Sequence, residues 1–257
     1  KSFEVKGLTL HPCGYSFKQS YLDLLHKVSE HNICSINKTL QVFLPSHFEK
    51  YLDKLAEATP PALSKRPIDN PALTPDQHNA LSHLKVAINT DQYSCTLIKG
   101  VTGSGKSRVY MEAAQQVLDA GKNIVILVPE ISLTPQTFSV FSQYFEYEID
   151  LIHSNLGEKQ KRQSWLRILT GTSRIVLGTR SAILTPLTNI GLIIIDEEHD
   201  ASFKQHDPAP RYHARDIAHY RALAENIPLI LGSATPSLES YFNAQAGNYT
   251  LVPMNHR

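Results

Sequence analysis

The sequence is poor in cysteine, in long apolar runs and in net charge. Only three cysteines occur among its 257 residues, Cys13, Cys34 and Cys95, and no two of them form a CxxC pair. Their spacing argues against a disulfide framework and against a zinc site, and it favours a reducing cytoplasm. No apolar run is long enough to span a bilayer, and no charged segment followed by an apolar stretch indicates a signal peptide. We therefore expect a cytoplasmic protein with no membrane partner.

Net charge provides little attraction for polyanions, because it is only +1 at pH 7. Any binding of nucleic acid must therefore come from local patches of charge. The length allows one large α/β domain and a small companion, and we expect two hydrophobic cores. The chain opens on Lys1 rather than on methionine, which we interpret as the start of a fragment of a longer protein.

Residues 1–59 mix helical and strand-like patterns and predict a small α+β domain. Five apolar or aromatic residues recur at helical spacing: Tyr21, Leu22, Leu24, Leu25 and Val28. Short strand-like runs occur at 3–5 and 40–44, and Ser46 is expected to cap another helix through Leu55. Prolines at positions 60, 61, 67, 71 and 75 then oppose helix continuation, so residues 60–72 are predicted to form a linker.

Residues 73–257 alternate apolar runs with helical stretches, which is the pattern of parallel strands joined by crossover helices. The predicted strands are 95–99, 123–128, 174–178, 192–196 and 229–232, and the clearest predicted helices are 106–120 and 159–169. A sheet of this kind places its ligands at the carboxyl ends of its strands. The motifs described next fall at those ends, so we predict an α/β domain that binds a ligand there.

The segment from Gly100 to Ser107, GVTGSGKS, matches the phosphate-binding P-loop in full. Its glycines let the backbone turn its amides onto phosphates at a helix N-terminus, while Lys106 reaches the β and γ phosphates and Ser107 offers a hydroxyl to Mg²⁺. A chance glycine-rich turn is the alternative, and the strand and helix on either side argue against it. The predicted binding residues for ATP and Mg²⁺ are Gly100, Thr102, Gly103, Ser104, Gly105, Lys106 and Ser107.

The run from Leu192 to His199 is an apolar strand that ends in the acidic motif DEEH. Asp196 is expected to hold Mg²⁺, and Glu197 is expected to orient or deprotonate the attacking water. A solvated strand end is the alternative, and the P-loop upstream makes the metal site the better interpretation. His199 is either satisfied by the acids beside it or links the ATP site to a DNA site, and we favour the link.

The order of P-loop, DEEH and the segment from Gly232 to Pro236, GSATP, resembles superfamily 2 helicases. The resemblance implies a RecA-like motor lobe, with a parallel sheet flanked by helices. In it, Ser233 and Thr235 would sense the γ-phosphate and signal its loss to bound DNA, and a turn that caps the next helix is compatible with this role. The segment from Leu73 to Gln77, LTPDQ, resembles the adenine-reading motif of these motors. The Gln77 amide can offer a donor and an acceptor to a base, and Thr74 can also cap a helix there.

Three further stretches narrow the resemblance to the PriA family of primosomal replication-restart helicases: VPEISLTPQ at 128–136, GTRS at 178–181, and the segment from Asp196 to Asp216. In that family the first two line a path for single-stranded DNA, and the third forms an aromatic-rich loop. Such a loop suits single strands, because rings stack on bases and cations follow the backbone. The implied DNA-binding residues are Pro129, Glu130, Thr134, Gln136, Thr179, Arg180, Phe203, Lys204, Tyr212 and Arg215.

Ordinary packing and a solvated helix face are the alternatives for Phe203, Tyr212 and Arg215, and we favour the loop. The sequence departs from the family pattern at Phe203, where a tyrosine is usual, and at 206–210, where two prolines stiffen the loop. The basic stretch 159–180 contains no acid, and most of it is explained by a solvated helix face. His153 and Ser154 also resemble a DNA-contact element of the family.

The resemblance further implies what the whole protein does. It would couple ATP hydrolysis to 3′-to-5′ movement on single-stranded DNA, remodel stalled or branched forks and promote primosome assembly and replication restart, with single-stranded-DNA-binding protein and other primosome proteins as partners. By position, residues 1–59 would be a winged-helix DNA-binding domain. A second lobe with zinc-binding cysteines and an arginine finger would follow, so this chain alone is expected to hydrolyse ATP poorly.

Two other functions stay open at this point. One is a different superfamily 2 DNA motor, such as a RecG-like helicase or a restriction-enzyme translocase. The other is a DNA-binding scaffold that senses nucleotide without motor activity.

Overall fold

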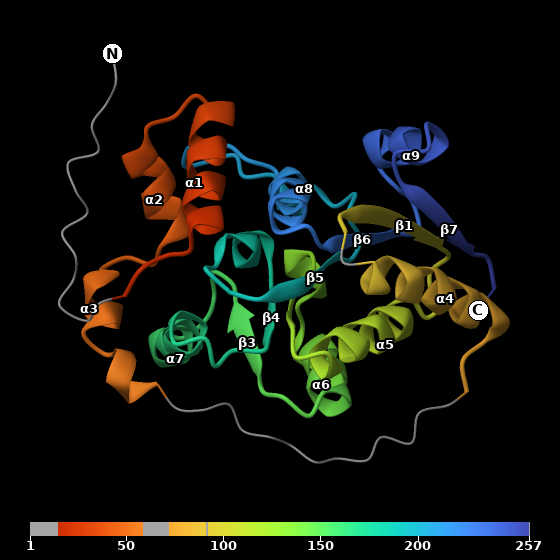
Figure 1. Cartoon of the computed structure of the whole chain (residues 1–257), viewed down its shortest axis with the longest axis horizontal. Helices are drawn as coiled ribbons and strands as arrows, with labels where there is room; N and C mark the ends of the chain where they lie inside the picture. The colour runs from red at the N-terminus through yellow and green to blue at the C-terminus, as the bar shows by residue number, and fades with distance from the viewer. Residues whose placement is uncertain (1–14, 59–71, 91, 257) are drawn as a thin grey trace.

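The computed structural model describes residues 15–58, 72–90 and 92–256, and a seven-stranded parallel sheet forms its centre (Figure 1). The strands are β1 (Ser94–Gly100), β2 (Asn123–Leu127), β3 (Ile149–Ile152), β4 (Ile175–Gly178), β5 (Ile190–Ile195), β6 (Pro228–Ser233) and β7 (Thr250–Met254). Their order across the sheet is β3-β4-β2-β5-β6-β1-β7, with parallel pairing throughout. The predicted α/β fold is confirmed.

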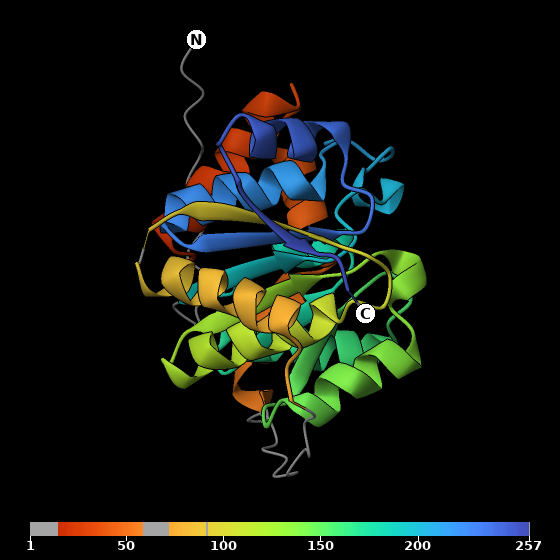
Figure 2. The same cartoon turned by 90° about the vertical axis from the view of Figure 1, so that its right-hand side faces the viewer.

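Helices connect the strands and cover both faces of the sheet (Figure 2). They are α1 (Gln19–His31), α2 (Ile36–Phe43), α3 (Glu49–Leu52), α4 (Pro75–Asn89), α5 (Lys106–Asp119), α6 (Pro135–Tyr144), α7 (Glu158–Leu169), α8 (Ala214–Glu225) and α9 (Leu238–Gln245). Short 3-10 turns are η1 (Leu55–Glu57), η2 (Glu130–Ser132), η3 (Arg180–Leu184) and η4 (Ala201–Phe203). None of the helices in the described ranges combines the length and apolarity that crossing a membrane requires.

The central strands are buried on both faces, as their unbroken apolar sequences predict. Alternate residues of a strand point to opposite faces, so β2 sends Val125 and Leu127 into one core and Ile124 and Ile126 into the other. The first core is shared with α1, α7 and α8, and the second with α4, α5 and α6. These two clusters are the two faces of one sheet, and not the cores of a large domain and a small companion that the length led us to expect.

The sequence patterns missed the two edge strands, β3 and β7, which lie at opposite ends of the sheet. β3 has only four residues, IDLI, and begins beside the acidic segment around Glu148. β7, TLVPM, is partly exposed and contains Pro253. Proline lacks a backbone donor and is tolerated at a sheet edge, so its presence obscured a strand that pairs on one side only.

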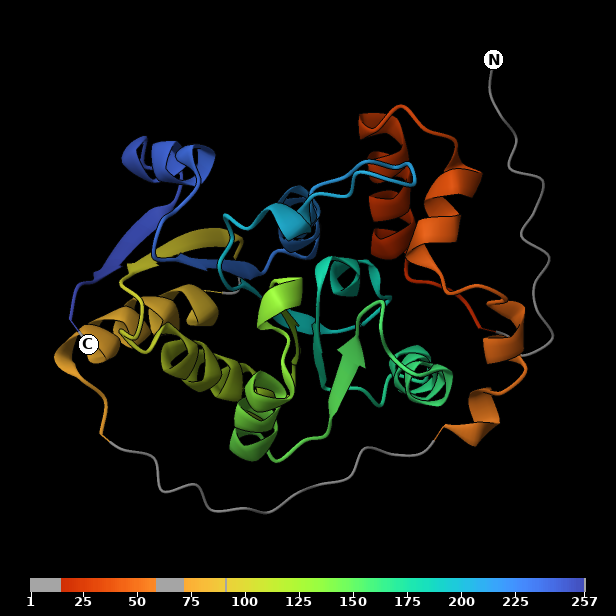
Figure 3. The same ribbon diagram turned by 180° about the vertical axis from the view of Figure 1, so that it is seen from behind.

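The described part of the front segment is helical (Figure 3). The helix predicted around Tyr21 to Val28 is confirmed as α1, whereas the strand predicted at 40–44 is wrong, because residues 40–43 complete α2. The apolar residues of this run belong to one face of α2, and Phe43 on that face is buried in the core. A short apolar run of this kind fits a helix as well as a strand. Ser46 does not cap α3, which begins after Phe48.

The front helices pack directly on the sheet domain. The Tyr21 hydroxyl donates a hydrogen bond of 2.7 Å to the carbonyl of Leu184, and Tyr51 contacts the Trp165 ring edge to face. Their buried side chains join the core on the α8 side of the sheet. The predicted strand at 3–5 and the linker prolines up to Pro71 lie outside the described residues, so the winged-helix domain and its boundaries stay predictions.

Candidate nucleotide and nucleic-acid site

The P-loop connects the end of β1 to the start of α5. Gly103 and Gly105 have φ values of 82° and 80°, in the left-handed region that favours glycine. At Gly105 a Cβ atom would lie 2.2 Å from Nε2 of Gln77, so a side chain there would displace the Gln77 amide from the loop. Lys106 is 6% exposed and donates from Nζ to the Gly100 carbonyl at 3.0 Å. The loop therefore holds its lysine against its own backbone.

The Ser104 hydroxyl is buried in this loop and has no hydrogen-bond partner among the described residues. Buried polar groups are nearly always satisfied in folded proteins, and an orphan indicates a group reserved for something else. A phosphate bound by the P-loop amides would supply an acceptor close to it. This observation fits the predicted nucleotide.

The acidic motif begins where β5 ends. Asp196 Oδ1 accepts hydrogen bonds from the Tyr110 hydroxyl at 3.2 Å and from the Glu197 N–H at 3.1 Å. Burial, and next the negative charge of Glu197, raise the pKa of Asp196 to about 6. Glu197 Oε1 lies 3.5 Å from Nζ of Lys106. The structure thus brings together the lysine and the two acids that the motifs predicted for ATP chemistry.

Magnesium fits the donors present. Both hydrogen bonds to Asp196 go to Oδ1, and Oδ2 has no partner among the described residues. Ser107 follows Lys106 in the first turn of α5. No group of three or more His, Cys, Asp or Glu side chains within the described ranges could hold a metal ion. Mg²⁺ typically takes one or two protein oxygens and completes its shell with water and phosphate, so this sparse donor set suits it.

Two neighbours of Asp196 have contacts that the motifs did not predict: Tyr110, which lies outside the motifs, and Gly232, the first residue of GSATP. Tyr110 is fully buried on α5 and directs its hydroxyl to Asp196. A Cβ atom on Gly232 would lie 1.5 Å from that hydroxyl, so only glycine leaves room for it at the end of β6. The first residue of the GSATP segment therefore has a steric role beside Asp196.

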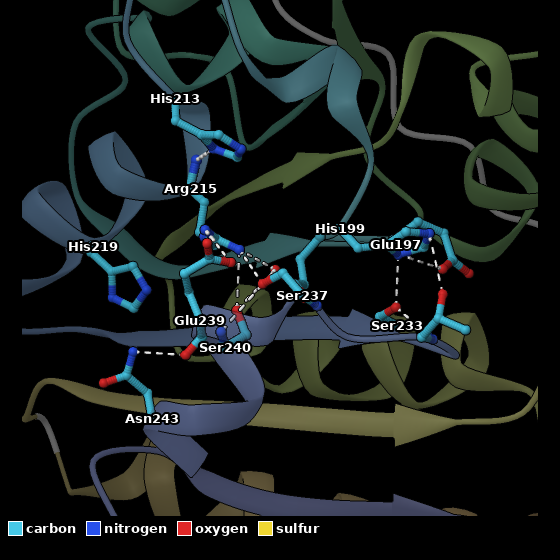
Figure 4. A network of polar contacts seen from close by, with 12 residues as sticks. Glu197, His199, His213, Arg215, His219, Ser233, Ser237, Glu239, Ser240 and Asn243 are labelled. Carbon is cyan, nitrogen blue, oxygen red and sulfur yellow. Dashed lines mark hydrogen bonds and ion pairs between the residues drawn. The ribbon is translucent and has the colours of Figure 1, made fainter. Parts of the chain in front are cut away.

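His199 connects the acidic motif to the GSATP segment. Its Nδ1 lies 2.8 Å from the Ser233 hydroxyl and 3.6 Å from Glu197 Oε2, and its Nε2 lies 3.4 Å from the Thr235 hydroxyl (Figure 4). The Thr235 N–H also donates to the Ser233 hydroxyl at 2.9 Å. Both interpretations of His199 are compatible with this geometry, because it contacts an acid and the two predicted coupling residues.

Gln77 touches the P-loop from the start of α4. Thr74 caps the helix in a capping box, in which Gln77 Oε1 accepts the Thr74 N–H at 3.0 Å. The other end of the amide, Nε2, donates to the Ser104 carbonyl at 3.2 Å. Both amide ends are therefore engaged within the protein. Adenine recognition by Gln77 stays a prediction, and its contact with the P-loop is a finding.

Several predicted DNA-binding residues line a cavity of about 470 Å³ at the β3 and β4 end of the sheet. Glu130, Thr179 and Arg180 contribute to its wall, as do His153 and Ser154. The front segment contributes residues 41–45, and α7 contributes Lys161 and Trp165. The two family stretches and the His-Ser pair thus share one hollow.

The remaining residues of the first DNA stretch have ordinary surroundings. Thr134 caps α6 by accepting the Thr137 N–H at 3.2 Å, and Gln136 is exposed in the first turn of that helix. Pro129 is buried and offers no surface to a ligand. Arg180 donates from Nη1 to the carbonyls of Ser202 and Lys204, at 3.0 and 2.8 Å, so it also braces the next loop.

The aromatic residues of the predicted loop are packed in the core, and Tyr212 also lines the cavity described above. Phe203 is 0% exposed and Tyr212 is 2% exposed, and both belong to the core on the α8 side of the sheet. The turn η4 and a backbone bridge between Lys204 and His213 direct both rings inward. Packing, the alternative considered for these rings, describes Phe203. Base stacking by Tyr212, at the wall of the cavity, stays a prediction.

Two cations of the loop are also engaged internally. Lys204 donates from Nζ to the Arg211 carbonyl at 2.7 Å. Arg215 pairs with Glu198, at 2.7 Å between Nη1 and Oε2. The prediction that Arg215 meets DNA phosphate is not supported here, because a buried carboxylate already occupies its guanidinium. The sequence patterns did not identify the residues around this guanidinium, which are Glu198, Ser237 and Ser240. A signal existed, because the three successive acids 196–198 cannot all face one metal ion.

Comparisons with known proteins agree with this geometry. Residues 74–243 match the family described as DEAD/DEAH box helicase. The replication restart protein PriA of Bacillus subtilis (strain 168) is 42% identical over 209 residues, which cover 81% of this chain and 25% of that protein. The PriA protein of Synechocystis sp. is 46% identical over 197 residues, covering 75% of this chain and 23% of that protein. The chain therefore spans about a quarter of the length of the curated relatives it matches.

Among solved structures, RecG bound to a three-way DNA junction is similar with a TM-score of 0.54. The match covers 92% of this chain and 30% of that chain at 20% identity. At this level of identity the likeness bears on the fold alone.

Proposed function

The chain belongs to the DEAD/DEAH box helicase family, and we propose that it is the ATP-binding lobe of a PriA-like 3′-to-5′ DNA helicase acting in the cytoplasm. The longer protein would recognise and remodel stalled or branched replication forks and promote primosome assembly and replication restart. The observation that carries this proposal is the convergence of Lys106, Asp196, Glu197 and His199 at one edge of the sheet. The identity to PriA proteins supports the choice within the family.

The side chains of this edge divide the work of phosphoryl transfer. Lys106 would leave the Gly100 carbonyl and neutralise the β and γ phosphates, while the P-loop amides hold them in place. Mg²⁺, held by Asp196 and Ser107, would supply charge neutralisation at the phosphates. Glu197 would orient or deprotonate the attacking water. His199 would report the state of the site to Ser233 and Thr235, which it already contacts.

Single-stranded DNA would lie along the cavity that Glu130, Thr179 and Arg180 line. Its lining includes Lys161 and Arg180, and cations of this kind suit a phosphate backbone. Forked DNA, single-stranded-DNA-binding protein and other primosome proteins would be partners of the longer protein. Zinc would belong to its downstream part.

Replacing Lys106 by alanine in the full-length protein tests the proposal. We expect unwinding and DNA-stimulated ATP hydrolysis to fall by at least about a hundredfold, because a positioned charge on the transferred phosphate is lost. Fork binding should be retained, as measured by fluorescence anisotropy with forks that have or lack a leading-strand 3′ end. Unchanged fork remodelling by the variant would instead favour a nucleotide-sensing scaffold.

A different superfamily 2 motor is the nearest rival. The RecG likeness shows the fold alone, whereas the two PriA proteins named above are 42% and 46% identical to this chain. An assay of replicative-helicase loading at a fork, with the full-length protein, separates the two, because a PriA-like enzyme should promote that loading. Fork remodelling without any such loading would argue for the rival.

A further inference from the structure

Glu198 points away from the ATP site, although it follows two residues that face it. Glu197 has a φ of 46°, and this left-handed backbone turns the chain between the two glutamates. The Glu197 carboxylate lies near Lys106 and His199, whereas Glu198 is fully buried and its N–H donates to the Gly232 carbonyl at 3.0 Å. The two glutamates of the DEEH motif therefore point in different directions, Glu197 towards Lys106 and Glu198 towards Arg215.

Four donors saturate the Glu198 carboxylate. Oε1 accepts the Ser237 N–H at 2.7 Å, and Oε2 accepts the hydroxyls of Ser237 and Ser240 at 3.1 and 2.9 Å and the Arg215 guanidinium at 2.7 Å. Burial alone raises the pKa of Glu198, but the Ser237 N–H and then Arg215 more than offset it, so the pKa lies below its ordinary value. The buried group is thus a charged, fully bonded carboxylate.

The donors come from two helices that begin near the ATP site. Arg215 is in the first turn of α8, and Ser237 is the N-cap of α9, where its hydroxyl accepts the Ser240 N–H. Figure 4 shows Arg215, Ser237 and Ser240 converging on one point. Thr235, which contacts His199, is only two residues before Ser237. The hydrogen bonds between Glu198 and Ser237 therefore also restrict the position of Thr235.

We propose that Glu198 and Arg215 are positioning residues for ATP hydrolysis, because they hold the GSATP segment and the start of α9 against His199. Neither side chain faces the P-loop, so they act through Ser233 and Thr235 rather than on the nucleotide. Loss of Arg215 leaves the buried Glu198 carboxylate without its ion-pair partner, and loss of Glu198 leaves Arg215 only one acidic partner, the exposed Glu239, at 3.9 Å. In either case the segment must rearrange to solvate the charge that remains. This inference rests on the proposed function.

Glu198→Gln and Arg215→Gln in the full-length protein, with their double variant, test it. For each single variant we expect the kcat of ATP hydrolysis stimulated by single-stranded DNA to fall on the order of tenfold, since small misplacement of a site is costly. The KM for ATP should change less than about threefold, because the P-loop and Asp196 are untouched. The double variant removes both charges and should lose less than the product of the two single losses.

Arg167→Gln is the matched control. Arg167 forms another buried ion pair, with Asp150, at 2.7 Å from Nε to Oδ1, between α7 and β3. The substitution Arg167→Gln should lower the melting temperature, and it should leave kcat unchanged when activity is assayed well below that temperature. If Glu198→Gln does not fold, Ser240→Ala removes a single donor and should still lower kcat severalfold.

Variants of Glu198 and Arg215 that lower only the melting temperature, as Arg167→Gln does, would overturn the inference. A rise in KM with unchanged kcat would also overturn it. A wild-type protein without DNA-stimulated hydrolysis would instead refute the proposed function itself.

Discussion

The nucleotide edge and the segment from Ala201 to Arg215 use their polar groups in opposite ways. At the edge, Ser104 has a buried hydroxyl without a partner among the described residues, and Asp196 leaves Oδ2 unbonded. In the segment, Arg215 donates to Glu198 and to two serines, and Phe203 is sealed in the core. The Tyr212 hydroxyl of the segment is also buried without a partner among the described residues, so the contrast lies in the charged groups. Asp196 keeps one carboxylate oxygen unbonded, whereas Lys204 and Arg215 are both engaged within the protein.

The largest test of this contrast is Phe203→Ala or Tyr212→Ala. Because both rings fill the core, we expect each change to lower the free energy of unfolding by about 3 to 5 kcal/mol. Denaturant unfolding measures this, and His206→Ala, an exposed change in the same loop, is the control. A loss of affinity for single-stranded DNA without a loss of stability would show that another loop conformation binds DNA.

A second test uses His219 on α8, whose two ring nitrogens lie 2.9 Å from the hydroxyls of Tyr93 and Tyr249. Burial, and next the Arg215 charge, lower its pKa to about 4. As the pH falls, His219 therefore takes up a proton near pH 6.5 in the unfolded state but only near pH 4 in the folded state. The contribution of His219 to the free energy of unfolding should be fully present above pH 6.5, and about 3 kcal/mol of it should be lost as the pH falls to 4.

His219→Gln cannot titrate and isolates this contribution. Chemical denaturation of both proteins across pH 4 to 7 should show a shallower decline for the variant. Parallel declines would mean that His219 binds protons equally in the folded and unfolded states.

A third test places a methyl group at Gly232. Its Cβ would collide with the Tyr110 hydroxyl, so Gly232→Ala should cost about 1 to 3 kcal/mol and weaken nucleotide binding. Tyr110→Phe removes the hydroxyl and should recover part of that loss in the double variant, as measured by a double-mutant cycle. Additive effects would indicate that the two positions do not share space.

The smallest expected effect is that of Gln77→Ala. It removes one hydrogen bond to the P-loop, at Ser104, and one within the capping box, so the KM for ATP should rise about fivefold. The adjacent exposed change His78→Ala is the control and should leave KM unaltered. An unaltered KM for Gln77→Ala would remove Gln77 from the nucleotide site.

Sequence patterns predicted the parallel sheet and the nucleotide edge well, because those signals are local. A P-loop needs eight consecutive residues between a strand and a helix, and DEEH needs only the end of β5. The environment of Phe203 depends on the core on the α8 side of the sheet, and that of Arg215 depends on the end of β5 and the segment after β6. No pattern within the loop distinguishes a ring that stacks on a base from one that packs inward.

The edge strands and the front helices show the same limit from another direction. β7 pairs only with β1, and its exposed residues and Pro253 conceal it. Residues 40–43, the second half of α2, were mistaken for a strand because a short apolar run fits either period. The partner strand of β7 lies far away in the sequence, whereas α2 packs on its neighbour α1, where Phe43 meets Tyr21.

The pairing of β1 with β6 joins Ser94 to Pro228, and between them the chain forms most of the domain. Contacts so distant in sequence close late and slowly during folding, because a long loop must be ordered first. Lys106 meets Glu197 only when β1, β6 and β5 lie side by side. Nucleotide should therefore bind only the finished sheet and shift the folding equilibrium towards it by mass action. ATP affinity would then serve as an assay of how much of a preparation has completed folding.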